Sequence, residues 1–456
     1  MCLLFACRKE SFTTNTDAQL QTTVDTLHFD TVFTTTGSVS QYFKIVNGNN
    51  KGIRLSSVRL AGGASSPFKI NVDGVAGPQA TNTEVLANDS VYVYVTVTIN
   101  PSAQNLPFIV RDSIEITYNG NRHWVQLDAF GQNAHFFRAR KITGTEVWNN
   151  DLPYLILGRL TVDTTATLTI NKGCKIYLHA DAPFIVHGTL QVNGEMFDST
   201  RVTFSGDRLD EPYRDFPASY PGLIFTASSK NSVINYGIIK NAYQAIVAVS
   251  PATAGTKLTL NDTIIDNAYD AGVLGLNTSI TARNVLISNC GKNLFLAGGG
   301  VYDFKHCTVA SFSNSYLQHK DPVFVLTNYT GSATAPVAAA LTASFTNCIF
   351  WGEQNGFVPN EAVVDAKGLT PSINFTKVLW RMRDAPNLSG LTVTNAINNQ
   401  PPLFDTINTA ERFYNFRLRG GSPALNTGVD ARVPIDLDGK PRPVGTAPDI
   451  GAYERR

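Results

Sequence analysis

The segment LNDTIIDNA at residues 260–268 is echoed twice elsewhere in the chain. Residues 234–242 read INYGIIKNA, and residues 282–290 read ARNVLISNC. A self-similar unit of about 22 residues, with two or three short strands per unit, is typical of a parallel solenoid. Each turn of such a fold cannot bury its apolar face alone, so stacking of successive turns creates the core. These three segments therefore predict a solenoid.

Two more segments, FKHCTVAS (304–311) and FTNCIFWG (345–352), extend the alignment. One column is then large and apolar: Ile239, Ile265, Ile287, Val309 and Phe350. The column two residues earlier is mostly small or apolar: Gly237, Thr263, Val285, Cys307 and Cys348. The intervals are 26, 22, 22 and 41 residues, and we attribute the last to longer loops around a preserved VFVLT strand (323–327). Cys307 and Cys348 are then neighbours on adjacent coils, and in-register strands favour stacked thiols over a disulfide.

Asn241, Asn267 and Asn289 follow two residues after the large apolar column. Asparagine tolerates the left-handed turn conformation, and stacked asparagines form hydrogen-bonded ladders. A second strand follows each of these turns: AIVAV (245–249), GVLGL (272–276) and NLFLA (293–297). The sequence thus predicts a turn after each asparagine.

Residues 168–207 resemble the first coils of right-handed parallel β-helix proteins, through Leu168, Ile170, Gly173, Ile176, Ile185, Val186, Gly188, Leu190, Gly194 and Phe204. RLRGGSPALNTGVD (417–430) and DLDGKPRPVGTAPDIGAYE (436–454) resemble the terminal segment of bacterial β-helix repeat proteins. The resemblance is to the pectate-lyase-like fold. It implies a β-helix over 140–400 and a C-terminal cap segment over 401–456, which we expect to cover the open end of the solenoid.

Residues 21–135 show a different pattern, with short strand-like runs separated by turn residues. Within the run 91–97, valine alternates first with tyrosine and then with threonine. About seven such strands are typical of an immunoglobulin-like β-sandwich. We therefore expect an all-β protein in which an immunoglobulin-like sandwich is followed by a right-handed parallel β-helix.

Composition excludes several classes of function. The 456 residues carry 37 basic and 36 acidic side chains without a basic cluster, which argues against nucleic acid as a partner. No stretch approaches the roughly 20 apolar residues that span a bilayer. The cysteines show no zinc-binding spacing, and we expect the four downstream ones, Cys174, Cys290, Cys307 and Cys348, to be buried thiols.

The chain opens MCLLFACRKES, in which Leu4-Phe5-Ala6-Cys7 resembles a bacterial lipobox. Recurring Asp-(Ser/Thr)-aliphatic tripeptides, such as Asp262-Thr263-Ile264, resemble the O-glycosylation pattern of exported Bacteroidetes proteins. The alternative, which we favour for most of them, is that strands of a β-protein begin after Asp turns. These features predict a lipoprotein of the cell envelope, anchored in the outer membrane by a lipid on Cys7, with residues 1–20 as signal remnant and tether. The alternative is a cytosolic chain with an apolar start.

The densest polar stretch, GDRLDEPYRDFPASYPG (206–222), has the composition of a sugar-binding loop. Its candidate glycan-binding residues are Asp207, Arg208, Asp210, Glu211, Tyr213, Arg214, Asp215 and Tyr220. A second candidate is a groove along one turn of the repeat, formed by Tyr236, Asp262, Asn284 and His306. The structural alternatives are a braced loop and a solvated row of turn residues.

Other chemistry has weaker support. His179 and His187 flank Asp181, but no third ligand is evident, so we predict no metal site there. The chain has no GxSxG, HExxH or P-loop motif, and we assign no catalytic residue. We expect a non-enzymatic protein that binds a polysaccharide or an envelope protein. The alternatives are a polysaccharide lyase or glycosidase, with Ca²⁺ if a lyase, and a purely structural envelope component.

Overall fold

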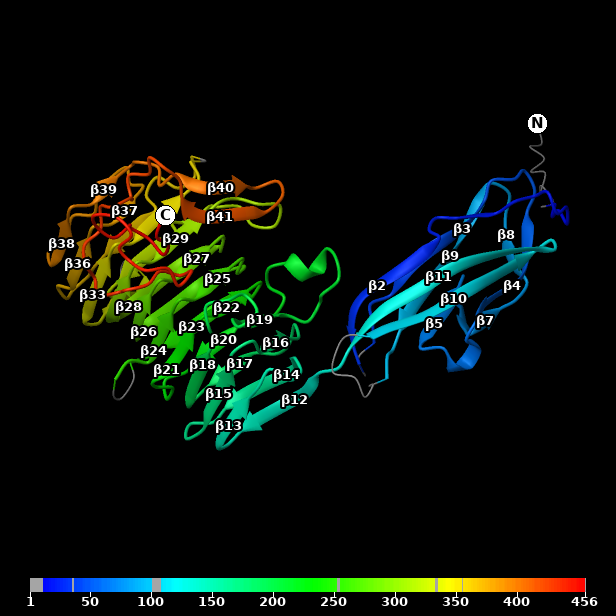
Figure 1. Cartoon of the computed structure of the whole chain (residues 1–456), viewed down its shortest axis with the longest axis horizontal. Helices are drawn as coiled ribbons and strands as arrows, with labels where there is room; N and C mark the ends of the chain where they lie inside the picture. The colour runs from blue at the N-terminus through cyan, green and yellow to red at the C-terminus, as the bar shows by residue number, and fades with distance from the viewer. Residues whose placement is uncertain are drawn as a thin grey trace. The chain divides into compact units, whose positions relative to one another are not determined.

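The computed structural model describes residues 11–34, 37–100, 108–251, 255–332, 335–354 and 356–455. It divides into two compact units, with the boundary between Ala134 and His135 (Figure 1). Throughout the described ranges the regular structure is β-strand, apart from two 3-10 turns, η1 (Gly63–Ser65) and η2 (Tyr213–Asp215). The same ranges hold no helix that is long and apolar enough to cross a membrane. Cys7, the predicted lipidation site, lies outside the described residues.

The first unit is a sandwich of two sheets around one core. One sheet has the order β1 (Gln21–Thr22), β3 (Gln41–Asn47), β9 (Asp89–Val97), β5 (Phe68–Val72) and β6 (Val75–Gly77). The other has the order β2 (Thr26–Phe33), β11 (Asn121–Gln132), β10 (Phe108–Tyr118), β4 (Ile53–Leu60) and β7 (Gln79–Ala80), with β8 (Thr83–Val85) also paired to β4. Alternation of buried and exposed residues along β9 places its valines in the core, as predicted.

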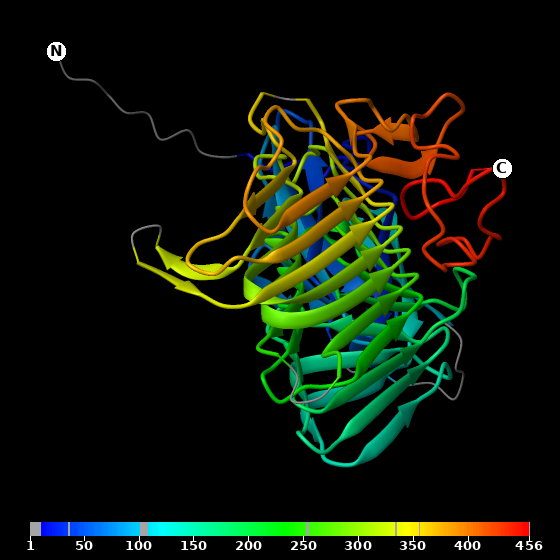
Figure 2. The ribbon, with the colours of Figure 1, turned by 90° about the vertical axis from the view of Figure 1, so that its left-hand side faces the viewer.

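The second unit is a parallel β-helix whose coils wind through three sheets. We call them sheets A, B and C, in the order in which the chain passes through them. In the described residues, 26 strands belong to this solenoid. Figure 2 shows the strands of successive coils stacked side by side. The predicted fold class is therefore confirmed.

The strands of each sheet pair in parallel with the same sheet of the next coil. The first coils are made by β12 (His135–Ile142) and β14 (Tyr154–Val162), whose first halves lie in sheet B and whose second halves lie in sheet C. Two long strands turn the corner from sheet C into sheet A: β26 (Ala271–Arg283) and β28 (Lys292–Lys305).

The remaining strands each belong to one sheet. Sheet A holds β13 (Thr145–Trp148), β15 (Thr167–Asn171), β18 (Thr189–Asn193), β21 (Ser232–Asn235), β24 (Leu258–Asn261), β33 (Leu341–Thr346), β36 (Ser372–Thr376) and β38 (Leu391–Thr394). Sheet B holds β16 (Lys175–Leu178), β19 (Val202–Gly206), β22 (Gly237–Lys240), β25 (Ile264–Asp266), β27 (Leu286–Ser288), β29 (Thr308–Ser311), β34 (Ile349–Gly352), β37 (Leu379–Trp380) and β39 (Ile397–Asn398). Sheet C holds β17 (Phe184–Val186), β20 (Leu223–Phe225), β23 (Gln244–Val249), β30 (Phe324–Thr327) and β35 (Ala362–Asp365).

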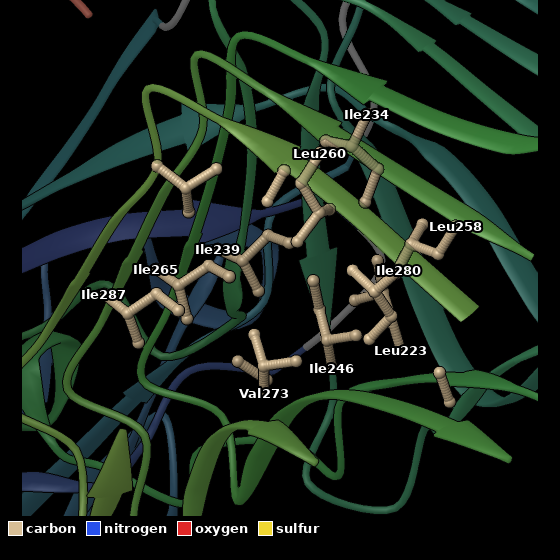
Figure 3. Close-up of a cluster of buried hydrophobic side chains, with 14 of the residues drawn as sticks. Leu223, Ile234, Ile239, Ile246, Leu258, Leu260, Ile265, Val273, Ile280 and Ile287 are labelled. Atoms are coloured by element: carbon tan, nitrogen blue, oxygen red, sulfur yellow. The ribbon is translucent and has the colours of Figure 1, made fainter. Parts of the chain in front are cut away.

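The apolar column of the sequence alignment is the inner face of sheet B. Ile239, Ile265, Ile287, Val309 and Phe350 pair in that order across five consecutive coils, and each is 0% exposed. Figure 3 shows the first three of these side chains in one row inside the solenoid. The direct pairing of Val309 with Phe350 confirms that the 41-residue interval hides no further coil. The thiols of Cys307 and Cys348 are free and buried, as expected.

Part of the long interval is a hairpin of β31 (Tyr329–Ser332) and β32 (Ala335–Ala338), which stands off the solenoid in Figure 2. A second hairpin, β40 (Phe404–Asn408) and β41 (Phe413–Leu418), follows the last coil. The final segment of the chain, residues 428–455, has almost no regular structure, and we call it the C-terminal strap.

The cap predicted over residues 401–456 packs along a flank of the solenoid, against the outer face of sheet B. Leu437, Ile450 and Ala452 of the strap share a cluster with outward side chains of that sheet: Leu286, Ala310, Ile349 and Leu379. At the end of the solenoid, Val393 of the last coil remains 40% exposed. The strap covers the flank in place of the end because the outward positions of sheet B in these coils are themselves apolar. Burying them lowers the free energy most.

Candidate functional site

Two rows of turn residues border sheet B, one on each side. The row between sheets A and B comprises Tyr236, Asp262, Asn284, His306 and Asn347, each in the left-handed conformation with φ between 48° and 55°. We call it the buried row, because Asp262, Asn284, His306 and Asn347 are at most 1% exposed. The row between sheets B and C comprises Asn241, Asn267 and Asn289, with φ of 65°, 56° and 51°. We call it the amide row.

The buried row contains four residues of the predicted groove, Tyr236, Asp262, Asn284 and His306. Asn284 Nδ2 donates to Asp262 Oδ1 at 2.9 Å, and it also donates to the carbonyl of Ile435 in the strap at 2.8 Å. Arg201, whose guanidinium lies 5.3 Å from the Tyr236 ring, donates to the carbonyls of Asp262 and Leu437. The structure thus buries Asp262, Asn284 and His306 instead of exposing them in a groove, and the strap contacts Asn284 through the Ile435 carbonyl and His306 through Arg442.

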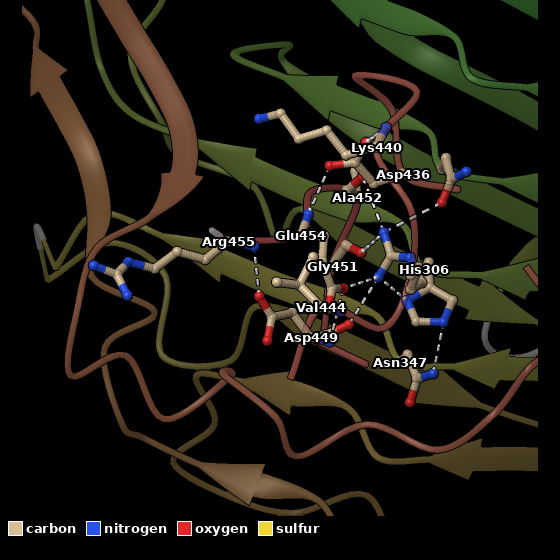
Figure 4. Close-up of polar contacts among 12 residues, drawn as sticks. His306, Asn347, Asp436, Lys440, Val444, Asp449, Gly451, Ala452, Glu454 and Arg455 are labelled. Atoms are coloured by element: carbon tan, nitrogen blue, oxygen red, sulfur yellow. Dashed lines mark hydrogen bonds and ion pairs between the residues drawn. The ribbon is translucent and has the colours of Figure 1, made fainter. Parts of the chain in front are cut away.

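Arg442 makes polar contacts both within the strap and with the buried row. Figure 4 labels three of its partners, His306, Asp449 and Glu454. Arg442 Nη1 donates to His306 Nδ1 at 2.5 Å and to the Asp449 carbonyl at 2.9 Å, and Nη1 lies 3.3 Å from Glu454 Oε2. Burial, together with the Arg442 charge, lowers the pKa of His306 to about 2, so the imidazole is neutral and accepts this hydrogen bond. These contacts are those of a structural network in which Arg442 Nε has no hydrogen-bond partner among the described residues.

The amide row borders a polar pocket of about 160 Å³ on the outer side of the solenoid. Its lining comes from distant parts of the chain: Asp215, Lys240, Asn241, Asp266, Asn267, Asn289, Asn314, Glu411, Arg412 and Tyr414. Sheet B supplies Lys240 and Asp266, which pair on β22 and β25. The loop 206–222 and the turn of the β40–β41 hairpin close the sides. Three carboxylates and two cations therefore converge on one cavity.

Asp266 is the carboxylate supplied by sheet B. Its Oδ1 accepts hydrogen bonds from Ser288 Oγ at 2.6 Å and Asn289 Nδ2 at 3.2 Å. Within the described ranges, no side-chain donor contacts its Oδ2. Burial raises the pKa of Asp266, against the opposing effects of these two donors and of Lys240. A carboxyl group of this kind retains its proton to higher pH than an exposed aspartate.

Asp215 and Arg412 form the opposite wall. Arg412 Nη2 donates to Asp215 Oδ2 at 3.2 Å, which links the loop 206–222 to the β40–β41 hairpin. Arg214 Nε lies 3.9 Å from the same oxygen. Two guanidinium groups thus lie beside this carboxylate. Glu411 is exposed at the rim of the pocket.

The amide row forms only one step of the ladder that the sequence predicts, between Asn267 and Asn241, because Asn289 Nδ2 donates to Asp266 Oδ1. It leaves one acceptor unused. Asn267 Nδ2 donates to Asn241 Oδ1 at 2.8 Å and to the Asp215 carbonyl at 2.9 Å. Asn241 Nδ2 donates to the Arg214 carbonyl at 2.7 Å. Among the described residues, the buried Asn267 Oδ1 has no hydrogen-bond partner. A buried amide oxygen without a donor costs about 1–3 kcal/mol unless a ligand or water supplies one.

The other predicted residues of the loop 206–222 lie apart from this pocket's lining. Asp207 bonds to His179 Nδ1 at 2.7 Å, and burial raises its pKa. The Arg208 guanidinium covers the Tyr213 ring at 3.9 Å. Tyr220 is 1% exposed, and its hydroxyl contacts the Phe204 carbonyl. Asp210, Glu211 and Arg214 also belong to this loop but are not among the pocket residues, so only Asp215 of the eight lines it.

The histidines that suggested a metal do not converge. His179 contacts Asp207, His187 Nδ1 contacts Thr226 Oγ1 at 2.9 Å, and Asp181 accepts from the Gly158 amide. In the described part of the chain no group of three His, Cys, Asp or Glu residues could hold a metal ion.

Sequence reasoning did not assign Asp266, Lys240, Glu411 or Arg412 to a site. Lys240 and Asp266 share an alignment column with Ser288, and a single acid in that column is a weak signal. The hairpin residues follow the last coil in sequence, and no repeat pattern places them beside coils that lie some 150 residues earlier.

Comparison with known proteins shows no matching family model and no matching curated protein. Two solved structures are weakly similar. A family 123 glycoside hydrolase from Clostridium perfringens is 12% identical with a TM-score of 0.19, over 28% of this chain and 26% of that one. The catalytic unit of a family 87 α-1,3-glucanase from Streptomyces thermodiastaticus is 10% identical with a TM-score of 0.21, over 78% of this chain and 88% of that one. Because both scores are low, the fold assignment rests on the strand pairing.

Proposed function

We propose that the protein acts on a glycan at the pocket bordered by the amide row, and that it hydrolyses a glycosidic bond there. The observation that supports this is the convergence of Asp215, Asp266 and Glu411 from three separate segments on one polar cavity. The neighbouring amides and cations are suited to sugar hydroxyls, which both donate and accept hydrogen bonds. The unpartnered Asn267 Oδ1 is an acceptor for one such hydroxyl.

Two carboxyl groups in different states are the usual requirement for glycoside hydrolysis. Asp266 is the proton donor in this proposal, since burial raises its pKa and its Oδ2 has no side-chain partner in the described residues. Asp215, beside Arg412 and Arg214, is the second carboxyl group, which activates water or attacks the anomeric carbon. Its ion pair with Arg412 opens when the sugar binds.

Binding without cleavage is the second candidate, and one observation favours it. Asp215 already pairs with Arg412, so the cavity is partly closed and its carboxylate is engaged. A closed polar cavity of this kind holds a sugar without needing to react with it. In that case the protein is a glycan receptor, as the composition and the lack of catalytic motifs led us to expect.

One experiment separates the two. The purified protein is incubated with a panel of plant, algal and host polysaccharides and oligosaccharides, with and without Ca²⁺. New reducing ends identify a hydrolase, unsaturated ends that require Ca²⁺ identify a lyase, and retention in affinity gels without cleavage identifies a receptor. Absence of both cleavage and retention, with every substrate, contradicts the proposal and favours a protein partner or a structural role.

We also propose that the protein is anchored at the cell envelope through a lipid on Cys7. The sequence Leu4-Phe5-Ala6-Cys7 is the support for it. Radiolabelled palmitate in growing cells should enter the wild-type protein and not a Cys7→Ala variant. Equal labelling of both, or of neither, contradicts the anchor.

A further inference from the structure

The outer face of the β1-β3-β9-β5-β6 sheet carries a cluster of exposed aromatic rings. Tyr42 on β3 is 54% exposed, and Tyr92 and Tyr94 on β9 are 37% and 43% exposed. We call the outward positions of β3, β9 and β5 that surround them the tyrosine face. The β-helix pocket uses none of these residues.

The three rings form one contiguous group. Tyr42 lies directly opposite Tyr94 across the β3–β9 ladder. Ring centroids are 5.3 Å apart for Tyr42 and Tyr92, 5.8 Å for Tyr42 and Tyr94, and 5.7 Å for Tyr92 and Tyr94. The planes of Tyr92 and Tyr94 differ by only 13°. Since the strands hold all three side chains, the rings are ordered before any ligand arrives.

The tyrosine face is also positively charged. Lys44 Nζ lies 4.6 Å from the centroid of the Tyr92 ring, and Lys69 is exposed on β5. Asn71 lies opposite Tyr94 on the β5 side of β9. The outward positions of β3, β5 and β9 hold no carboxylate. Asp73, exposed in the turn that follows β5, donates its backbone N–H to the Tyr92 carbonyl at 3.0 Å, so one acidic residue borders this face beside the two cations.

The outer face of the other sheet is different. There, Glu115 pairs with Arg59 at 2.5 Å and Arg122 at 2.8 Å, so a buried carboxylate is balanced within the face. Trp124 and Phe130 are 39% and 44% exposed, and neither has a ring neighbour among the described residues. Scattered exposed aromatics are normal, whereas a grouped set with a net positive charge marks an interaction surface.

We propose that the tyrosine face binds an acidic polysaccharide whose pyranose rings lie against the tyrosines and whose carboxylates pair with Lys44 and Lys69. The apolar faces of pyranose rings present C–H groups that pack on the electron-rich face of an aromatic ring. Charge complementarity selects an anionic polymer over a neutral one. This site goes beyond the proposed pocket chemistry, since it holds the polymer on the sandwich unit and performs no reaction.

Cross-strand tyrosine pairs also stabilise sheets without any ligand, by about 0.2–1 kcal/mol each. The two roles make different predictions. A stabilising pair responds to loss of the ring in unfolding experiments only. A binding face responds in ligand affinity, while a phenylalanine in place of tyrosine keeps the ring and most of the affinity.

The test is affinity electrophoresis of the whole protein in gels containing polygalacturonate or its fully methyl-esterified form, which is the same polymer without its charge. A Tyr42→Ala/Tyr94→Ala variant should lose about tenfold or more in affinity for polygalacturonate. Tyr94→Phe should bind within about threefold of wild type. Lys44→Gln should lower the affinity and weaken its dependence on salt. The esterified polymer should bind wild type more weakly.

Trp124→Ala is the matched control, an exposed aromatic on the opposite face, and it should bind as wild type. Cleavage of short oligosaccharides, which do not reach the tyrosine face, is measured separately for the same variants, so failure of the pocket chemistry is distinguished from failure of the tyrosine face. Equal losses in the Trp124 and tyrosine variants overturn the proposal, as does equal binding of the charged and esterified polymers. If the alanine variant unfolds, Lys44→Gln and Tyr94→Phe still decide the question.

Discussion

The buried row and the amide row are built alike and used differently. Both follow a β-strand, both place polar residues in the left-handed conformation, and both form hydrogen bonds from coil to coil. The buried row is covered by the strap, and its amides are partnered by the strap's carbonyls. The amide row borders a cavity, and one of its oxygens lacks a partner in the described residues.

The comparison shows that the local turn does not determine the role of the row. The role is determined by the elements that cover the row. Beside the buried row, carbonyls of the strap accept hydrogen bonds from Arg201, Asn284 and Asn347. Asp262 Oδ2, which lies 3.5 Å from Arg283 Nη2, is buried without a hydrogen-bond partner in the described residues. Beside the amide row, the covering elements include two loops joined by the ion pair of Asp215 with Arg412, whose guanidinium also lies 4.6 Å from the Tyr316 ring. The strap contacts of the buried row stabilise the fold, whereas the loops over the amide row leave a cavity in which a reaction can occur.

The largest expected effect tests the buried row. Arg442→Ala removes the guanidinium that contacts His306 and Glu454, and it leaves buried partners behind. We expect a loss of about 3–5 kcal/mol in the free energy of unfolding of the β-helix, measured by urea denaturation. Arg432→Ala, an exposed arginine of the same strap, is the control and should cost less than about 0.5 kcal/mol. Equal losses in the free energy of unfolding for the two variants would show that the Arg442 contacts stabilise the fold no more than an exposed arginine does.

The next effect separates the chemistry of the two rows. Asp266→Asn should lower glycan cleavage at least about a hundredfold while leaving the fold intact, because an amide cannot deliver the proton. Asp262→Asn is the matched change in the buried row and should leave the cleavage rate within about threefold. The cleavage rates of both variants and of wild type are measured with the best substrate of the panel. Equal activity of Asp266→Asn and wild type would exclude Asp266 as the acid.

Removing one amide from each row gives a smaller difference. Glycine is the replacement, since it adopts positive φ without strain and so isolates the hydrogen bonds. Asn284→Gly should cost about 2–3 kcal/mol, because it removes hydrogen bonds to the buried Asp262 and to the half-buried Ile435 carbonyl, and a 3.5 Å contact with Arg442. Asn241→Gly should cost about 1 kcal/mol. Urea denaturation of both variants checks this, and a larger cost for Asn241 would reverse the assigned roles.

The smallest expected effect is a pH dependence. Since burial raises the folded-state pKa of Asp266 above the ordinary 3.8, folding is penalised as pH rises through that range. The melting temperature of Asp266→Asn should exceed that of wild type at pH 7, and the difference should shrink as pH falls below the ordinary pKa. Cleavage by wild type should fall as pH rises through the folded-state pKa. A stabilisation that grows on acidification would contradict the raised pKa.

The repeat made most of the β-helix predictable. Ile265 recurs at the coil interval because inward positions of stacked strands must be apolar, and that constraint is visible in one sequence. Asn267 was predictable for the same reason, since left-handed turns restrict the choice of residue. The flanking position of the strap was not, because a terminal motif shows that a segment packs on the solenoid without showing which face it covers.

The pocket was harder to predict than the fold. Asp266 is a single acid in its alignment column, and Arg412 follows the last coil in sequence. The loop 206–222 has the composition of a binding loop, yet most of its polar side chains contact one another or nearby coils, as Arg208 contacts Tyr213. Composition identifies where polar groups are concentrated. It does not identify which of them face a cavity.

The strap has a consequence for the order of assembly during synthesis. Arg201 and Leu437 are 236 residues apart, and Asn284 and Ile435 are 151 apart. Coils can stack one by one as they leave the ribosome, since each needs only its neighbour. The strap is synthesised after the coils from Arg201 to Asn347, and it can dock on them only when they are already in register. Docking of the strap therefore requires that these coils have formed. A chain truncated before Arg442 keeps its coils and lacks the contacts that join them.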